Sequence, residues 1–213
     1  ELSDVYDDEK YEKSQAYKKV RFQFGLISST FSVMLTLAFI ILGGFAWVDG
    51  IARGFSGNEI IISLIFFGII MLGSDILMTP FSYYSTFVIE EKYGFNKTSK
   101  KTFILDKFKG LLMTVIIGGG ILALIVWFYQ IAGDNFWWYA WILVAVFSVF
   151  MNMFYAKLIV PLFNKQVPLK DGGLRSKIEE YAQSVGFQLD NIFVIDGSKR
   201  STKANAYFSG FGK

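Results

Sequence analysis

The sequence predicts an all-α polytopic membrane protein with four transmembrane helices, which carries an incomplete α+β unit at its carboxy-terminal end. The first observation behind this prediction is composition: 53% of the 213 residues are hydrophobic and 18% are aromatic. A water-soluble domain cannot cover that much apolar surface with polar residues. The second observation is that the charged residues lie in blocks between long apolar runs, which is typical of an integral membrane protein.

The opening segment, residues 1–21, is charged and hydrophilic. We expect a solvated juxtamembrane helix, with the basic cluster of Lys18, Lys19 and Arg21 at the level of anionic lipid headgroups.

The following membrane domain, residues 22–157, contains four apolar runs. The first of them has 27 residues without a charge, more than the roughly 20 that span a bilayer. Pro80 is expected to kink or end the second, and an aromatic cluster typical of a membrane interface opens the fourth. The predicted spans are 22–48, 60–81, 110–132 and 136–156.

Basic residues predict the orientation of these spans. They gather in the amino-terminal segment and in the long polar loop 82–109, whereas the two connections on the opposite side hold only Arg53. By the positive-inside rule, the amino-terminal segment, loop 82–109 and the carboxy-terminal unit are predicted to be cytoplasmic.

The carboxy-terminal unit, residues 158–213, begins with an extended link punctuated by Pro161 and Pro168. Its patterns predict a helix over 174–185, stopped by Gly186, and strands over 192–195 and 204–211 that are joined by a polar turn. A unit this small rarely buries enough surface to fold alone, and it leaves strand edges unpaired. We therefore expect a continuation of the chain or a separate partner to complete it.

The composition also limits the chemistry of the chain. It contains no cysteine and no histidine, which are the usual zinc ligands, and histidine is also the commonest general base. The basic residues flank membrane spans and do not form one soluble face, which argues against nucleic-acid binding. We therefore predict no catalytic residue and no metal ligand in this chain.

Three stretches resemble the type I CAAX prenyl proteases, which are integral-membrane zinc metallopeptidases. They are EKSQAY at 12–17, PFSYYSTFVIEEKYGFNKT at 80–98, and the stretch from VPLFNKQVPL at 160 to ANAYFSGFGK at 213. The resemblance implies a helical chamber in the membrane and cleavage of carboxy-terminal peptide bonds in prenylated or membrane-associated substrates.

The same resemblance implies which parts of the enzyme this chain holds. In the family, the zinc motif H-E-x-x-H follows the strand pair, so the chain resembles an amino-terminal half and is predicted to be inactive alone. Zn²⁺ and the catalytic Glu are expected from a carboxy-terminal half, in the same or a separate polypeptide. The Asn-Ala-aromatic sequence on the substrate-binding edge strand of thermolysin-like peptidases matches Asn205, Ala206 and Tyr207.

Two polar groups elsewhere have competing interpretations. Asp75 lies inside the second predicted span, and Asn152 approaches the same leaflet from the fourth. They form either a functional intramembrane polar site or a structural polar pair. Glu90, Glu91 and Asn96 are expected to form a cytoplasmic cap that holds the second and third spans in place.

Two other functions remain open at this stage. The chain could be a non-catalytic membrane scaffold or carrier that retains the chamber without the protease half. A transporter is a third hypothesis, motivated by Asp75 and by the glycine-broken third span.

Overall fold

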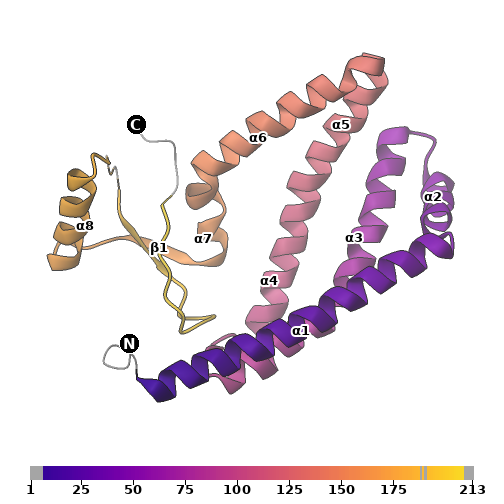
Figure 1. Ribbon diagram of the computed structural model, residues 1–213. Helices are drawn as coiled ribbons and strands as arrows, with labels where there is room; N and C mark the ends of the chain where they lie inside the picture. The colour runs from indigo at the N-terminus through magenta and orange to yellow at the C-terminus, as the bar shows by residue number, and fades with distance from the viewer. Residues whose placement is uncertain (1–6, 188, 190, 209–213) are drawn as a thin grey trace.

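The computed structural model describes residues 7–187, 189 and 191–208, and long helices dominate it (Figure 1). The first helix, α1, runs over Asp8–Ile41 and begins where the Asp7 carboxylate accepts hydrogen bonds from the next backbone N–H groups. It ends before Gly43, whose φ of 70° is left-handed and favours glycine. The range 22–48, predicted as one span, is therefore not one helix.

Helix α2, Gly44–Phe55, follows this break and packs against both α1 and α3. Val48 and Ala52 are buried on its inner face, and Ile62 of α3 is also buried. The apolar residues after Gly43 thus form a short packed helix in place of the end of the first predicted span.

Helix α3, Glu59–Tyr84, starts at Asn58, whose side chain accepts from two backbone N–H groups of the first turn. It passes through Pro80 and continues into a π-helical turn, η1, over Ser85–Glu90. Pro80 therefore does not end the helix. Much of the predicted loop 82–109 is helical as well, because Ser99 caps a further helix, α4, over Lys100–Met113.

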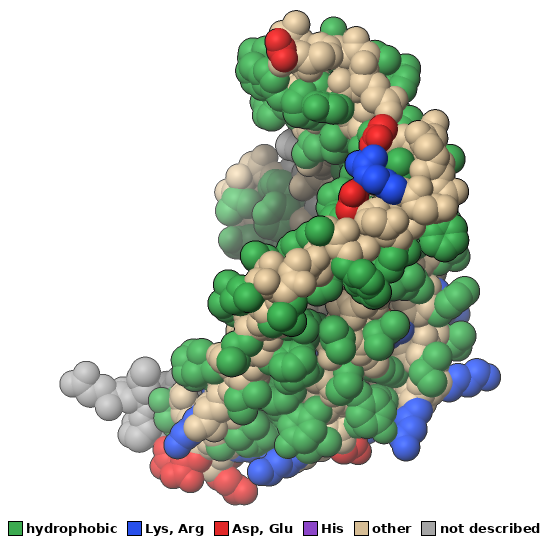
Figure 2. All heavy atoms as spheres, turned by 90° about the vertical axis from the view of Figure 1, so that its right-hand side faces the viewer, with side chains coloured by type: hydrophobic (Ala, Val, Ile, Leu, Met, Phe, Trp, Pro, Cys, Tyr) green, Lys and Arg blue, Asp and Glu red, His purple; other side chains and the backbone are tan. Residues whose placement is uncertain are grey.

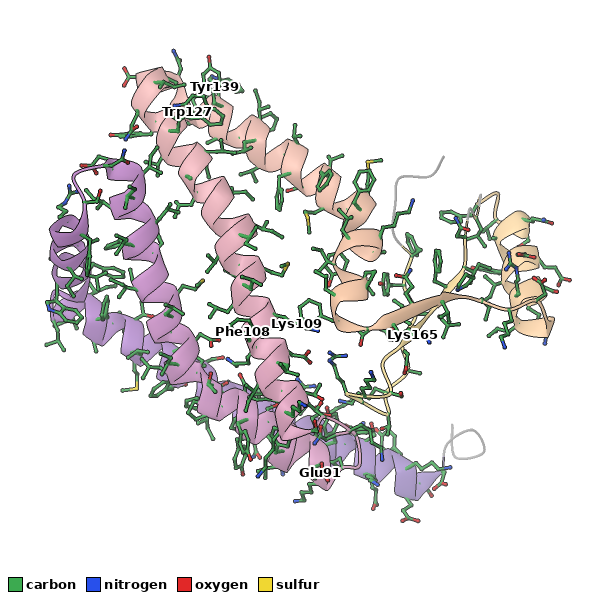
Figure 3. The ribbon with its side chains drawn as sticks, turned by 180° about the vertical axis from the view of Figure 1, so that it is seen from behind. Glu91, Phe108, Lys109, Trp127, Tyr139 and Lys165 are labelled. Atoms are coloured by element: carbon green, nitrogen blue, oxygen red, sulfur yellow. The ribbon has the colours of Figure 1, made fainter. Side chains whose placement is uncertain are left out.

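Helix α4 runs through a second π-helical turn, η2 (Thr114–Gly118), into α5 (Gly119–Ala132). The 3₁₀ turn η3, Gly133–Asn135, then reverses the chain into α6, Phe136–Leu158 (Figure 1). Aromatic rings close this hairpin, and Trp127 and Tyr139 lie at that end in Figure 3.

Within the described residues, three helical runs are long and apolar enough to cross a membrane: Asp8–Ile41, Glu59–Glu90 and Lys100–Phe163. The third contains the reversal at η3. Figure 2 shows hydrophobic side chains covering the helices, with Lys, Arg, Asp and Glu side chains gathered mainly at the lower end and in a smaller group near the top.

The carboxy-terminal part contains α7 (Val160–Phe163), β1 (Lys165–Pro168), α8 (Gly173–Ser184) and β2 (Phe193–Asp196). The predicted helix 174–185 and strand 192–195 correspond to α8 and β2. Gly186 has a φ of 69° at the end of α8.

The pairing of the strands differs from the prediction. β2 pairs antiparallel with β1, in the register Lys165↔Asp196, and within the described residues it does not pair with 204–208. Pro161 is tolerated because it lies in the first turn of α7, where no intrahelical N–H bond is required. Residues 204–208 form no strand in the described structure, and residues 209–211 lie outside the described residues.

Candidate functional site

The predicted substrate-binding residues, Asn205, Ala206 and Tyr207, lie in an exposed segment outside regular secondary structure. Within the described part of the chain, residues 203–208 make no backbone–backbone hydrogen bonds with other residues. The Ala206 N–H donates to the Asn205 side-chain oxygen at 2.9 Å, and the Phe208 ring packs edge-on against Phe187. The Lys203 N–H also donates to the Ser201 hydroxyl, so the backbone groups available for pairing are the others of this segment.

Backbone hydrogen bonds hold the residues between the turn after β2 and this exposed segment. Lys97 N–H donates to the Arg200 carbonyl at 3.0 Å, and Thr202 N–H donates to the Phe95 carbonyl at 3.1 Å. Asn96 and Ser201 form an antiparallel bridge between these two contacts. The loop 94–98 and the residues 200–202 thus run side by side immediately before the exposed segment.

The first side-chain anchor of this segment is Arg200. Its guanidinium contacts the Asp106 carboxylate of α4 twice, from Nε to Oδ2 at 2.6 Å and from Nη2 to Oδ1 at 2.7 Å. Nη1 donates to the Asn164 side-chain oxygen after α7. The hydrogen bonds to Asp106 outweigh partial burial and raise the pKa of Arg200 above its usual range. One side chain therefore links the segment to α4 and α7.

The second anchor is Lys203, two residues before Asn205. Its ammonium donates to Glu90 Oε2 of η1 at 2.6 Å and also to the Tyr17 hydroxyl of α1. The ammonium lies 4.6 Å from the Tyr17 ring centre and 4.5 Å from that of Phe95. Cation–π attraction therefore adds to the ion pair.

These contacts change the titration of Lys203. Partial burial opposes its charge, but the hydrogen bonds to Glu90 and Tyr17 outweigh that effect and raise the pKa of Lys203 above its usual value. Glu90 is at the same time bonded by the Tyr17 hydroxyl at 2.5 Å, and Arg21 Nη1 lies 3.4 Å from its Oε1. The cluster thus joins α1, η1 and the exposed segment.

The residues of both anchors were not identified as functional from the sequence. Tyr17 and Glu90 lie within the stretches that resemble the family, and this was the one feature of the sequence that could have indicated their importance. Glu90, Glu91 and Asn96 were expected to act only as a cap for two spans. Asn96 does bond Glu91 at 2.8 Å, but Glu90 binds the carboxy-terminal segment.

Asp75 has a different partner from the one that was considered. It accepts a hydrogen bond from Lys107 Nζ of α4 at 2.6 Å, whereas Asn152 lies exposed on α6. The structure therefore brings Asp75 and Lys107 together, and not Asp75 and Asn152. Further along α4, Lys109 donates to the Leu162 carbonyl of α7 at 2.8 Å, and Figure 3 labels its position on the helix.

The donor groups of this chain do not fit a zinc site. Zinc in peptidases is held by His, Cys, Asp or Glu side chains converging on one point. The chain has no His and no Cys, and no group of three such donors converges among the described residues. We therefore derive no hydrolytic step from its side chains.

The sequence of this chain matches two protein-family models and several curated proteins. A family model described as "CAAX prenyl protease N-terminal, five membrane helices" matches residues 1–165, and one described as "Peptidase family M48" matches residues 168–213. The chain is 40% identical to the CAAX prenyl protease 1 homolog of Arabidopsis thaliana, over 100% of this chain and 52% of the relative. It is 36% identical to the human CAAX prenyl protease 1 homolog, over 100% of this chain and 46% of the relative.

A solved structure matches the fold as well. The crystal structure of S. mikatae Ste24p superposes with a TM-score of 0.90 at 40% sequence identity, covering 98% of this chain and 50% of that one. The chain spans about half the length of the curated relatives that it matches.

Proposed function

Because this chain belongs to the CAAX prenyl protease family of integral membrane proteins, we propose that it is part of a membrane-embedded zinc metalloendopeptidase. The whole protein cleaves carboxy-terminal peptide bonds of prenylated or otherwise membrane-associated substrates. This chain contributes the wall of the membrane chamber and the segment that binds the substrate backbone. The zinc site and the catalytic Glu are supplied by a carboxy-terminal half, in the same or a separate polypeptide.

The observation that carries this proposal is the exposed segment 203–208. It makes no backbone–backbone hydrogen bonds within the described residues, yet Arg200 and Lys203 anchor it to the helices. A fixed segment with available N–H and C=O groups can hold an extended peptide by β-augmentation, in which backbone hydrogen bonds give affinity and register. Asn205, Ala206 and Tyr207 are the residues that would lie along the substrate.

The membrane topology is part of the same proposal. The run Lys100–Phe163 crosses the membrane twice, because the chain reverses at η3 in its middle. Together with α1 and α3 this gives four crossings. Asp106, Glu90 and Tyr17 then lie at the cytoplasmic ends of their helices, on the side where the substrate segment is held.

Replacement of Tyr207 by proline in the whole protein tests the backbone role directly. Tyr207→Pro removes one N–H donor and obstructs strand pairing, so kcat/KM for a prenylated peptide should fall by about 10- to 100-fold. Tyr207→Phe is the matched control and should remain within about threefold of the parent. Asn205→Ala serves as a second variant if the proline substitution prevents folding.

The proposal would be overturned by a folded Tyr207→Pro protein that retains its metal and cleaves at the parent rate. Zinc content, read beside a denaturing gel, tests the second half of the proposal. Zinc that copurifies only with a His-bearing sequence is the expected result, because this chain has neither His nor Cys. A zinc-free preparation with undiminished peptidase activity would rule out the metallopeptidase assignment.

A further inference from the structure

A cavity of about 400 Å³ lies between α1 and the end of α3. Its lining includes Arg21, Phe24 and Ser28 from α1, and Phe81, Ser85 and Thr86 from the α3–η1 helix. This volume is within the range of pockets that hold small molecules, about 300–1,000 Å³. The proposed proteolysis does not use this cavity, although Arg21 in its lining also contacts Tyr17 and Glu90, the partners of Lys203.

The two ends of the cavity differ in chemistry. At one end, the Arg21 side chain is 54% exposed and uses only Nη1 for its printed contacts, with Tyr17 and Glu90. Nε and Nη2 of Arg21 and the hydroxyls of Ser85 and Thr86 make no hydrogen bonds within the described part of the chain. Several donors are therefore free at this end of the cavity.

The other end is aromatic. The centre of the Phe24 ring lies 6.1 Å from that of Phe81 and 5.1 Å from that of Tyr84, on which it stacks. Further along α1, the centre of the Phe31 ring lies 4.9 Å from that of Phe81. The cavity thus combines a cationic, hydroxyl-lined mouth at Arg21 with the rings of Phe24 and Phe81 in its lining. A ligand that fits both ends carries an anionic group on an apolar chain.

The position of the cavity relative to the charges supports the same ligand class. Arg21 is the last charged residue before the charge-free run 22–48, and Glu90 ends the helical run that begins at Glu59. The mouth therefore lies where lipid headgroups meet the acyl region. Glu90 contacts Arg21 at the mouth, but Lys203 binds Glu90 at 2.6 Å, so Arg21, Lys203 and Glu90 together carry a net charge of about +1.

We propose that this cavity binds an anionic phospholipid of the same leaflet. The lipid phosphate accepts hydrogen bonds from the Arg21 guanidinium and from the hydroxyls of Ser85 and Thr86, and an acyl chain lies against Phe24 and Phe81. An arginine fork suits a phosphate because it can donate two parallel hydrogen bonds.

The test uses the whole protein in detergent, titrated with phosphatidylglycerol or phosphatidylcholine, with bound lipid measured by native mass spectrometry. We expect phosphatidylglycerol to bind at least several-fold more tightly than phosphatidylcholine. Arg21→Gln should reduce that affinity by about five- to tenfold, since one basic residue near an anionic lipid is worth about that much. Arg53→Gln is the matched control, because Arg53 is ion-paired with Asp49 and Glu59 at another site.

A second variant keeps the test independent of the charge change. Gly25 also lines the cavity, and a Cβ atom built there meets no atom within 4 Å, so Gly25→Phe should place a ring in the cavity without backbone strain. This variant should lose phosphatidylglycerol binding while its unfolding temperature stays close to that of the parent.

Three results would overturn the proposal. One is equal phosphatidylglycerol binding by Arg21→Gln, Gly25→Phe and the parent. Another is equal binding of the two lipids by the parent. The third is displacement of phosphatidylglycerol by millimolar inorganic phosphate alone, which would identify the site as one for a free anion. None of these readouts depends on peptidase activity.

Discussion

Arg200 and Asp106 are 94 positions apart in the sequence, yet they form a two-pronged ion pair with contacts of 2.6 and 2.7 Å. Both side chains are about three-quarters shielded from solvent, at 25% and 24% exposure. The pair fixes the turn after β2 to helix α4, and through Asn164 it also reaches the residue after α7. It connects the carboxy-terminal part to the helices at two points.

Asp106→Asn tests how much this ion pair contributes to the free energy of unfolding. The amide keeps the shape of the side chain but removes the charge, so Arg200 is left partly buried without its counter-ion. We expect a loss of about 2 kcal/mol in the free energy of unfolding, measured as a lower midpoint in detergent. Asp171→Asn is the control, since Asp171 is 98% exposed beside Arg175 and should change the midpoint very little. Equal midpoints for the parent and Asp106→Asn would contradict the assigned role.

Lys203→Met should lower peptidase activity, because it keeps the packing against Tyr17 and Phe95 but removes the ion pair with Glu90. The pair is partly exposed, so its contribution is reduced by solvent to about 1 kcal/mol, or about a fivefold effect on kcat/KM. Lys203→Arg restores the charge and should recover most of the activity. Failure of the arginine variant to exceed the methionine variant would show that the charge does not position the segment.

The raised pKa of Lys203 fixes the pH dependence of that contribution. A lysine whose folded-state pKa is raised stabilises the folded state fully below its unfolded value of about 10.4, and the contribution is lost as pH rises through the folded pKa. The activity ratio of the parent to Lys203→Met should therefore be constant between about pH 6 and 9. A ratio that changes several-fold within that window would assign the titration to another group.

Asp75 and Lys107 should behave as a structural pair. Each single neutralisation, Asp75→Asn or Lys107→Met, leaves one charge without its partner near the membrane, so each should lower the unfolding midpoint. The double variant should be more stable than the sum of the single effects predicts. Ion-coupled flux in liposomes that Asp75→Asn abolishes would instead support the transporter hypothesis.

Gly43 and Gly54 provide a matched pair of glycine substitutions at the two ends of α2. Gly43→Ala places a side chain at a φ of 70° and should cost about 1 kcal/mol of stability. Gly54→Ala meets no neighbouring atom and should be neutral or stabilising by up to about 1 kcal/mol. Unfolding midpoints of the two variants, measured side by side, test the break between α1 and α2. A tolerated Gly43→Ala would mean that α1 can continue through this position.

Local patterns predicted the elements that local forces determine. The charge-free runs correspond to the apolar helices, and the apolar spacing over 174–185 corresponds to α8, because burial of one helix face needs no knowledge of a distant partner. The break before Gly43 was not predicted, since the charge-free run 22–48 continues through it.

Long-range partners could not be predicted from the sequence. Lys203 and Glu90 are separated by 113 positions, and no periodicity indicates that they meet. Asp75 was compared with Asn152 because the segment holding Lys107 was expected to be a loop outside the membrane. The cap at Ser99 starts α4 before Lys107, and this helix carries the lysine to Asp75. The pairing of β1 with β2 was missed for a related reason, since Pro168 favoured an unpaired link.

The π-helical turn η1 makes the number of residues before Glu90 as important as their identity. A turn with hydrogen bonds from i to i+5 contains one residue more than an α-helical turn, and each residue in a helix rotates the following side chains by about 100°. Removing a single residue from 85–90 would restore regular α-helix and turn the Glu90 carboxylate away from Tyr17 and Lys203. The rotational phase of one helix therefore determines whether Lys203 is held, and a deletion here would leave segment 203–208 fixed by Arg200 alone without altering any residue of the segment.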